Sequence, residues 1–423
     1  MAAKKFDIIV FGATGFTGKH CVKELAEVWD ENPDLKWAVA GRSMEKLRSV
    51  VDWAAEKSGR DLKQVEYVCA DIQDDASLNS MCQQGKLILN LVGPYHFYAM
   101  PVIQACVKNK CHHIDISGEI QFLERLQLEY HEKAKEAGIY MVESCGFDSI
   151  PADMGVIYAK KMFPGILNSV ESYLSSKSGP EGSKFNFGTL NSGMNVVSHF
   201  REIQAIRNKL HPTPLPTYKP KLKVKNRVFY SDFCERWSVV FSGSDVPNVE
   251  RSQRYLYEKE NQRPIQYAAY ATEKSLAVLL GIILVVVNLA IFAFFRCGRK
   301  LIEKYPGAFT FGAFSHEGPS DAQMAGTSFN FKFRGRGFSS EAVEKTEKED
   351  MEIITQVDGP EMAYVATPIV MVQSALTILQ EADKLPERGG VYTPAAAFYK
   401  TTLIDRCHQH GVKFSVTKPA YKL

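Results

Sequence analysis

Residues Phe6 to Gly18 read FDIIVFGATGFTG, and this stretch decides the fold expected for the chain of 423 residues. Its first half, Phe6–Phe11, is rich in β-branched and aromatic residues, which predicts a buried strand. The second half places glycine at positions 12, 15 and 18, after that strand and at the start of an amphipathic helical pattern. A strand, a glycine-rich turn and a helix in this order are typical of the first unit of a dinucleotide-binding fold.

Each of the three glycines has its own expected task. Gly12 permits the tight turn, and Gly15 lets backbone N–H groups approach a pyrophosphate. Gly18 lets the helix pack closely on the strand. The alternative is a glycine turn that shapes the backbone and binds nothing.

The alternation of strand and helix continues to about residue 150. Buried strands are also predicted at Trp37–Gly41, Val65–Ala70, Leu87–Val92, His113–Ile116 and Tyr140–Ser144, with helical patterns between them. Ser43 is the predicted N-cap of the helix that follows the second strand. Six strands with intervening helices imply a parallel sheet with right-handed crossovers. We therefore expect an α/β fold with a Rossmann-type doubly wound sheet.

The residues after the second strand discriminate between the two nicotinamide cofactors. NAD-binding proteins usually carry Asp or Glu here, to accept a hydrogen bond from the ribose 2′-OH. In this chain Gly41 is followed by Arg42, and Lys46 comes one turn later. A guanidinium group fits a 2′-phosphate, so we expect NADP, with NAD as the less favoured cofactor. The alternative is that Arg42 is an ordinary surface residue. Asp71, after the third strand, is expected to meet the adenine amino group.

The residues after the later strands are expected near the reactive end of the cofactor, because ligands bind at the carboxyl ends of parallel strands. Gly93, Pro94 and Tyr95 follow the fourth strand and are expected to line the nicotinamide side. Tyr95 is positioned either to hydrogen-bond a substrate carbonyl or simply to pack. Asp148 follows the sixth strand. We take Asp148 and Tyr95 as the candidate catalytic residues, with helix capping as the alternative role for Asp148 and for Glu119.

Composition excludes several other classes of protein. The formal net charge of +3 indicates no nucleic-acid partner. The nine cysteines form no CxxC pair and show no zinc spacing, so we expect reduced thiols and no metal site.

An uninterrupted apolar run from Leu276 to Phe295 interrupts this otherwise soluble pattern. Its length of about 20 residues suits a helix that crosses a bilayer core. Three interpretations compete: a single span, a buried core helix, and a monotopic insertion into one leaflet or a lipid monolayer. Four basic residues between Arg296 and Lys304 predict that the C-terminal flank stays in the cytosol. The N-terminus resembles no signal peptide, so both flanks are expected on one side, which favours the monotopic insertion.

Lysines and one arginine alternate along residues 219–227, KPKLKVKNR. One interpretation is the solvated face of an edge strand, where lysine prevents unwanted pairing. The other is a strip that faces anionic lipid headgroups. Both stay open.

The motifs GATGFTG, AGR, NLVGPY, IDISGE and GFDSIPAD occur in this order, and together they resemble the saccharopine dehydrogenase family. The resemblance returns at Gly359–Ala375 and Gly389–Phe398. It implies a dinucleotide-binding domain at residues 1–152 and a second α+β domain at 153–358 that carries the hydrophobic segment 275–296. It further implies that a C-terminal segment, 359–423, returns to the first domain. The implied cofactor contacts are Gly12, Thr14, Gly15, Phe16, Thr17, Gly18, Arg42, Asp71, Gly93 and Pro94.

Two departures from this family argue against saccharopine as the substrate. Thr14 stands where saccharopine-forming reductases have a second glycine, and the apolar run has no counterpart in the soluble enzymes. Similar bacterial proteins are associated with the reduction of lipid chains. We therefore expect an NADP-dependent oxidoreductase that acts on a small-molecule or lipid substrate. Its expected place is the cytosolic face of a membrane such as the endoplasmic reticulum, or a lipid droplet. The alternative is a catalytically silent dinucleotide-binding protein that acts as a scaffold on a lipid surface. Either would allow a homodimer.

Overall fold

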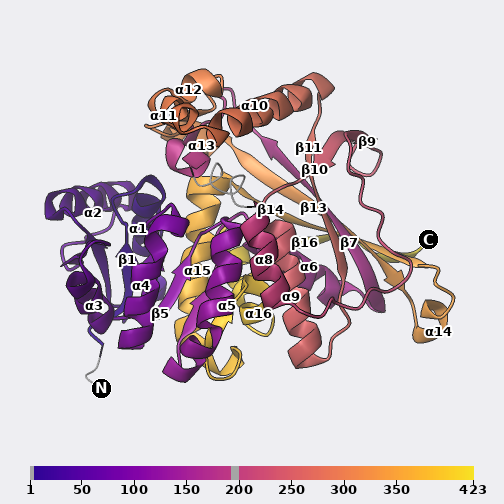
Figure 1. The fold of residues 1–423 in the computed structure, drawn as a ribbon, viewed down its shortest axis with the longest axis horizontal. Coiled ribbons are helices and arrows are strands. Elements are labelled where there is room, and N and C mark those ends of the chain that lie inside the picture. Colours follow the sequence, from indigo (N-terminus) through magenta and orange to yellow (C-terminus); the bar gives the residue numbers. More distant parts are fainter. Residues whose placement is uncertain (1–3, 192–199) are drawn as a thin grey trace.

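Two seven-stranded sheets dominate the computed structural model, which describes residues 4–191 and 200–423 (Figure 1). The strand order of the first sheet is β15-β6-β5-β4-β1-β2-β3, and that of the second is β16-β14-β13-β7-β11-β10-β9. A short third sheet pairs β8 (Phe185–Asn186) with β12 (Phe314–Ser315).

The first sheet is parallel throughout. Its strands are β1 (Phe6–Phe11), β2 (Trp37–Gly41), β3 (Glu66–Cys69), β4 (Gly85–Asn90), β5 (His112–Asp115), β6 (Tyr140–Val142) and β15 (Gly390–Tyr392). The order 3-2-1-4-5-6 is that of a doubly wound dinucleotide fold. The predicted Rossmann-type sheet is therefore confirmed, with its six strands within two residues of their predicted ends.

Helices cover both faces of this sheet, because successive side chains of a strand point to opposite faces and apolar side chains occur on both. Ile8 and Val10 pack in one cluster with α1 (Phe16–Glu27), α2 (Met44–Ser58) and α15 (Thr367–Gln380). Phe6, Ile9 and Phe11 pack in the other. That cluster holds α3 (Asp75–Gln84), α4 (Tyr95–Asn109) and α5 (Ile120–Ala137).

The C-terminal part of the chain contributes to both sheets. β15 adds a seventh parallel strand beside β6. β16 (Lys413–Lys422) instead forms the edge of the second sheet, beside β14 (Met351–Pro360). The division of the chain into domains at residues 152 and 358 stays a prediction.

The second sheet is mixed and has two unlike faces. Its remaining strands are β7 (Ile166–Lys177), β9 (Phe229–Ser231), β10 (Arg236–Val240), β11 (Gln266–Glu273) and β13 (Ser328–Phe338). Phe329, Phe331 and Phe333 alternate along β13 and are buried. They lie against α6 (Ile150–Met162), where a Cβ added to Gly155 would stand 2.3 Å from the Phe333 ring. The other face of β13 carries Asn330, Lys332, Arg334 and Arg336.

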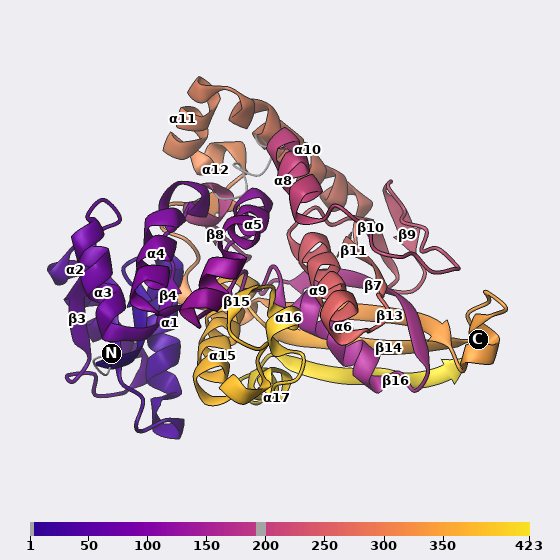
Figure 2. The same ribbon diagram turned by 60° about the horizontal axis from the view of Figure 1, so that its bottom comes forward.

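The remaining helical elements lie between these parts along the chain. They are η1 (Trp29–Glu31), α8 (Phe200–Leu210), α9 (Asp245–Glu260), α12 (Pro306–Phe309), α13 (Asp321–Gly326), α14 (Glu341–Glu344), η2 (Met362–Ala366), η3 (Ala382–Lys384), α16 (Pro394–Phe398) and α17 (Leu403–Gln409). Seen after a turn about the horizontal axis, α15, α16 and α17 lie between the first sheet and the second (Figure 2).

The apolar run forms α10 (Leu276–Phe294) on the surface, at the top of Figure 1. Within α10 only Leu279, Leu289 and Ala293 are buried. Two described helices, 276–294 and 362–380, are long and apolar enough to cross a membrane; 17% of the first is buried and 78% of the second. The interpretation of the run as a buried core helix is therefore wrong. The apolar helix that does lie in the core is α15 together with η2.

The chain turns back directly after α10. It continues as α11 (Arg296–Lys304), and the two helices meet at Gly298, where an added Cβ would lie 2.1 Å from the Phe292 carbonyl oxygen. β11 precedes α10, β13 follows α11 and α12, and both strands pair with β7. A single span would separate β11 from β13 by a bilayer. The shared sheet is incompatible with that interpretation.

Residues 219–227 do not form the edge strand that their alternation allowed. The segment is irregular and crosses β11, where the Leu222 N–H donates to Gln266 Oε1 at 2.9 Å. The Lys225 N–H donates to the Tyr270 hydroxyl at 3.1 Å. These backbone donors are satisfied by side chains of β11, which replaces the pairing of a strand.

Candidate cofactor and active site

The glycine loop joins β1 to α1 at the carboxyl edge of the first sheet. Gly12 has φ +87°, and a Cβ there would stand 2.9 Å from the Leu91 carbonyl carbon. A Cβ on Gly18 would stand 2.2 Å from the Gly12 oxygen. Both positions therefore require glycine for the backbone itself. Gly15 differs, because a Cβ there would contact only the Gly12 oxygen, at 3.2 Å, and would otherwise point into open space.

The first turn of α1 is suited to an anion. Gly15 is its N-cap and supplies no side chain, and no acidic residue occupies the turn. The first N–H groups of a helix lack partners within the helix and carry the positive end of its dipole. The exposed backbone at Thr14 and Gly15 therefore fits a pyrophosphate, and the open side of Gly15 is the space a Cβ would fill. The Phe16 ring points elsewhere, toward Tyr364, so its expected cofactor contact is limited to its backbone.

Arg42 and Asp71 lie at the same edge, where Arg42 follows β2 and Asp71 follows β3. Arg42 is exposed, and among the residues that the structure describes its guanidinium group has no carboxylate partner. Ser43 Oγ accepts from the Lys46 N–H at 3.3 Å, which confirms the predicted N-cap of α2. The Lys46 side chain is exposed. Asp71 Oδ1 accepts from the Gln73 N–H at 3.0 Å and shapes its own turn.

Tyr95 begins α4, but its hydroxyl faces inward. It donates to the Asn90 carbonyl oxygen at 3.0 Å and accepts from the Ile116 N–H at 3.4 Å. Burial raises the pKa of Tyr95 well above its usual range. The packing role that the sequence left open thus has contacts to support it. The contact with a substrate carbonyl stays a prediction without such support.

The Glu119 side chain caps α4, the helix before it, and not α5, the helix that follows it. Its two carboxylate oxygens accept from the N–H groups of Tyr95 and His96, each at 2.9 Å. The N-cap of α4 is Pro94, which has no side-chain acceptor, so Glu119 neutralises that helix end. Gly93 remains exposed beside it, next to the glycine loop.

Asp148 lies after β6 at the same edge of the sheet. The residue is exposed, yet protein atoms surround its carboxyl group, and this desolvation raises its pKa. A Cβ added to Gly118 would lie 3.7 Å from both Asp148 Oδ2 and Ser244 Oγ. Among the described residues no donor bonds to the Asp148 carboxyl group, although Ser244 Oγ donates to its carbonyl oxygen at 2.7 Å. The carboxyl group is therefore free to exchange a proton with a ligand bound at this edge.

Helix α9 brings a set of buried polar side chains behind Asp148 that sequence reasoning missed. Asp245 and Asn248 are fully buried, and within residues 4–191 and 200–423 the structure gives neither side chain a hydrogen-bond partner. Burial, and then repulsion from Asp148 and Asp153, raises the pKa of Asp245 well above its usual range. A buried, unpartnered carboxyl group is held in its protonated form.

The same set extends to the ends of β6 and β15. Arg251 Nη2 donates to Glu143 Oε2 at 2.6 Å, and Ser252 Oγ donates to Asp153 Oδ2 at 2.7 Å. Burial raises the pKa of Glu143 to about 8, against the opposing effect of Arg251. Burial also raises the pKa of Asp153 to about 7. Carboxyl groups with raised pKa values cluster at functional sites, and Asp245 is the one whose pKa is raised by burial and then by repulsion from Asp148.

The sequence did carry a signal for α9. Asp245, Asn248 and Ser252 are spaced by three and four residues, so they share one helix face. Leu256 and Val249 mark that face as buried. Polar residues at core positions of an amphipathic pattern were the sign of a buried polar site. Within the described residues, no group of three His, Cys, Asp or Glu side chains could hold a metal ion.

Comparison with known proteins identifies the class. The family model described as the saccharopine dehydrogenase NADP binding domain matches residues 8–142. A human saccharopine dehydrogenase-like oxidoreductase is 45% identical over 418 residues, which covers 98% of this chain and 97% of the relative. A lipid droplet localized protein of Caenorhabditis elegans is 35% identical over 423 residues, 97% of this chain and 98% of the relative.

A solved structure shares the fold across the whole chain. Apo saccharopine dehydrogenase (L-Glu forming) from Saccharomyces cerevisiae aligns with a TM-score of 0.55 at 11% identity and covers 99% of this chain and 100% of its own. The doubly wound sheet, the open glycine loop and the matched domain define an NADP-dependent oxidoreductase. More closely, the chain belongs to the family of saccharopine dehydrogenase-like oxidoreductases. The predicted resemblance and the preference for NADP are confirmed.

Proposed function

We propose that this protein is an oxidoreductase that works on the surface of a membrane or lipid droplet and exchanges hydride between NADP and a lipid-like substrate. The observation that carries the proposal is that α10, which is largely exposed and apolar except for Asn288, belongs to the same folded unit as the cofactor edge. The name of the nematode relative, a lipid droplet localized protein, points the same way.

The exposure of α10 is too large for a water-facing helix. Ten large apolar side chains between Val278 and Phe295 are exposed, from 37% at Phe292 to 77% at Phe294. Immersing these side chains in hydrocarbon is worth on the order of 10 kcal/mol at about 25 cal/mol per Å². The one polar side chain in the middle, Asn288, donates to the Leu284 carbonyl oxygen at 2.8 Å, so its amide is partly satisfied within the helix.

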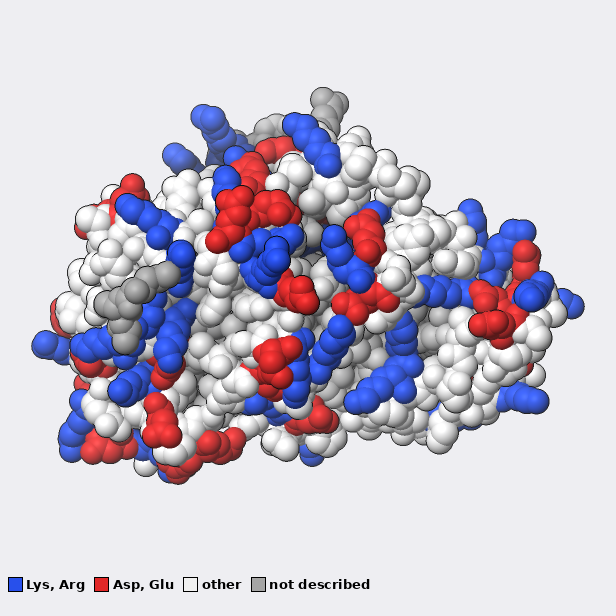
Figure 3. All heavy atoms as spheres, turned by 90° about the horizontal axis from the view of Figure 1, so that it is seen from below, with Lys and Arg blue, Asp and Glu red and all other residues white. Residues whose placement is uncertain are grey.

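The path of the chain around α10 supports a monotopic insertion. β11 and β13 lie on either side of β7, so both flanks of the helix stay with the folded body. Arg296 and Lys300 of α11 are exposed directly after the apolar run, at a position that suits lipid headgroups. The opposite face of the molecule shows Lys and Arg mixed with Asp and Glu (Figure 3), which suits contact with water. The body thus presents one apolar end and one charged end.

The site residues have roles in this chemistry. Bound NADP supplies or accepts the hydride. The first turn of α1 holds the pyrophosphate and Arg42 the 2′-phosphate. Asp148, which follows β6, exchanges the proton that must accompany the hydride on the neighbouring substrate atom. Asp245 and Asp153 are buried carboxyl groups behind Asp148. Their raised pKa values favour the neutral form, so they add little negative charge next to Asp148.

Isotope tracing tests the activity even while the substrate is unidentified. NADPH that carries deuterium on its reactive carbon is incubated with the protein and a lipid extract, and the lipids are analysed by mass spectrometry. We expect deuterium in a defined lipid class. The control is Gly15→Val, which should abolish the signal because the new side chain fills the pyrophosphate site. No deuterium above that control would instead favour the scaffold, since a silent cofactor-binding protein takes up NADPH without transfer.

A deletion tests whether α10 anchors the protein to a membrane or lipid droplet. Replacing residues 276–295 by a short Gly/Ser linker should move the protein from the floating lipid-droplet and membrane fractions into the soluble fraction. Tags at both ends of the full chain should be cleaved by protease added to intact microsomes. A deleted protein that still floats would contradict the proposed anchor, and protection of one tag alone would contradict the monotopic insertion.

A further inference from the structure

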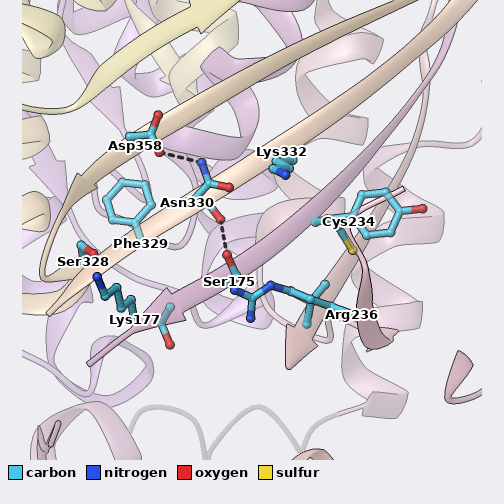
Figure 4. A pocket seen from close by; sticks show the side chains of 12 residues that line it. Ser175, Lys177, Cys234, Arg236, Ser328, Phe329, Asn330, Lys332 and Asp358 are labelled. Carbon is cyan, nitrogen blue, oxygen red and sulfur yellow. Dashed lines mark hydrogen bonds between the residues drawn. The ribbon is translucent and has the colours of Figure 1, made fainter. Parts of the chain in front are cut away.

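The face of the second sheet that carries Lys332 and Arg334 contains a cavity of about 270 Å³ (Figure 4). Strand ends from β7, β10, β11, β13 and β14 line it. Thr272, in its wall, precedes the N-cap of α10, Ser275, by three residues. This places the cavity beside the start of the apolar helix and away from the carboxyl edge of the first sheet.

Three cations line the cavity: Lys177, Arg236 and Lys332. They come from three different strands and surround one hollow, as Figure 4 shows. Within residues 4–191 and 200–423, the structure gives none of the three an ion-pair or hydrogen-bond partner for its side chain. Three cations without a partner leave the cavity positively charged, so an anion that enters it is stabilised.

The one carboxylate in the wall does not neutralise them. Asp358 accepts from Asn330 Nδ2 through one oxygen and from Gln356 Nε2 through the other, each at 2.6 Å. Its lone pairs are thus already engaged by neutral amides. The cavity keeps an excess of two positive charges from its lining side chains, three cations against one carboxylate.

The neighbouring basic residues on the same strand are arranged differently. Arg334 Nε and Arg336 Nε both donate to Glu352 Oε2, at 2.6 and 2.8 Å. Lys332 shares their face of β13, but within the described part of the chain it forms no ion pair with an acidic residue. The ion pairs along β13 therefore end where the cavity begins. The cavity is thus suited to bind an anionic ligand and is not part of a continuous ion-paired surface.

We infer that this cavity binds the phosphate-bearing headgroup of an anionic lipid in the surface that holds α10. The inference rests on the proposed lipid association. A helix immersed in the hydrocarbon edge of a monolayer has its first residues at headgroup level, and the cavity opens beside those residues. Arginine and lysine are the side chains that bind phosphate most often, by forked hydrogen bonds and as a point charge.

Vesicle flotation with two compositions tests the inference. The full chain is mixed with vesicles of phosphatidylcholine alone, or with vesicles that also contain phosphatidic acid. We expect tighter binding to the anionic vesicles for the wild type. The triple variant Lys177→Ala, Arg236→Ala, Lys332→Ala should lose this preference, by on the order of 100-fold at about 1 kcal/mol per cation, while its binding to neutral vesicles is unchanged.

A matched variant separates a site from general attraction. Lys108→Ala, Lys345→Ala and Lys348→Ala remove the same charge from exposed positions elsewhere and should keep the preference. An equal loss in this control would overturn the inference, and so would wild-type binding that is indifferent to phosphatidic acid.

Calorimetry keeps the inference separate from the proposed anchor. Glycerol 3-phosphate, which carries the headgroup chemistry without acyl chains, should bind the wild type and not the triple variant. Inorganic phosphate that binds equally well would indicate a site for free phosphate and contradict the headgroup. If no vesicle of either composition is bound, the proposed lipid association fails. The headgroup site is then tested by glycerol 3-phosphate alone. A wild type that does not bind glycerol 3-phosphate overturns the inference.

Discussion

The ring of Phe16 meets the ring of Tyr364 edge to face, with centroids 4.7 Å apart. Phe16 opens α1 beside the cofactor loop, whereas Tyr364 lies in the π-helix η2 that leads into α15. The Tyr364 hydroxyl in turn accepts from the Asn186 N–H at 2.7 Å. The first turn of the cofactor helix is thus supported by segments that follow it by about 170 and 350 residues.

This contact predicts that Tyr364 affects cofactor binding without touching the cofactor. Tyr364→Ala removes the ring that fixes Phe16 and should weaken NADPH binding several-fold, and it should lower the free energy of unfolding by about 3–5 kcal/mol. Tyr364→Phe keeps the ring and loses only the hydroxyl contacts, so its NADPH affinity should stay close to wild type. Fluorescence titration measures the affinity. Equal affinity for both variants would show that the contact is not coupled to the site.

The glycine loop yields a prediction that separates binding from folding. Gly15→Val should abolish NADPH binding while the melting temperature changes little, because the added Cβ would approach only the Gly12 oxygen, at 3.2 Å. Gly18→Val should instead destabilise the fold, because its Cβ would stand 2.2 Å from the Gly12 oxygen. Titration and thermal unfolding of both variants check this. Normal NADPH affinity in Gly15→Val would mean that the loop is only structural.

Arg42 should determine the choice between the two cofactors. Arg42→Asp places a carboxylate where the 2′-phosphate is expected, so NADPH binding should weaken and the ratio of NADPH to NADH affinity should fall by tenfold or more, about 1.4 kcal/mol. Arg48→Asp, one turn and more along α2, removes the same charge and should leave the ratio unchanged. Calorimetric titration with both cofactors is the measurement. A ratio that Arg42→Asp does not alter would contradict the assignment.

Glu24 predicts a pH dependence of stability. Burial, and then repulsion from Glu27, raises its pKa from 4.5 to about 8. Between these values the folded chain keeps a proton that the unfolded chain releases, so this group makes stability fall as pH rises, by up to about 1.4 kcal/mol per pH unit. Glu24→Gln removes that contribution and should show a smaller loss between pH 5 and pH 8. Urea unfolding at several pH values tests it, with the exposed Glu56→Gln as the control that should follow the wild type.

Asp148 should govern turnover and not binding. Asp148→Asn keeps the shape of the side chain but cannot exchange the proton, so hydride transfer should slow by about 10²–10⁴-fold while the affinity for NADPH is unchanged. The rate of deuterium transfer from labelled NADPH is the readout. A variant that transfers at the wild-type rate would remove Asp148 from the reaction.

The fold of the first 150 residues could be predicted because its determinants are local. Strand and helix periodicity and the spacing of Gly12, Gly15 and Gly18 all lie within a few residues of one another. The position of α10 could not, since a run that is apolar on every side does not show whether protein or lipid covers it. The buried polar set could not be assembled either, because Arg251 and Glu143 are 108 residues apart. Tyr95 illustrates a third limit: the sequence places it at the correct edge, but only packing decides that its hydroxyl points inward.

The position of β7 between β11 and β13 has a consequence for how the protein is made. During translation α10 is synthesised before β13, β14, β15 and β16. The most hydrophobic segment therefore leaves the ribosome while both sheets still lack strands. Nascent chains that end shortly after residue 300 have no partner for that edge of β7. If α10 is the proposed anchor, any factor that binds it during synthesis therefore meets a chain whose two sheets are still incomplete.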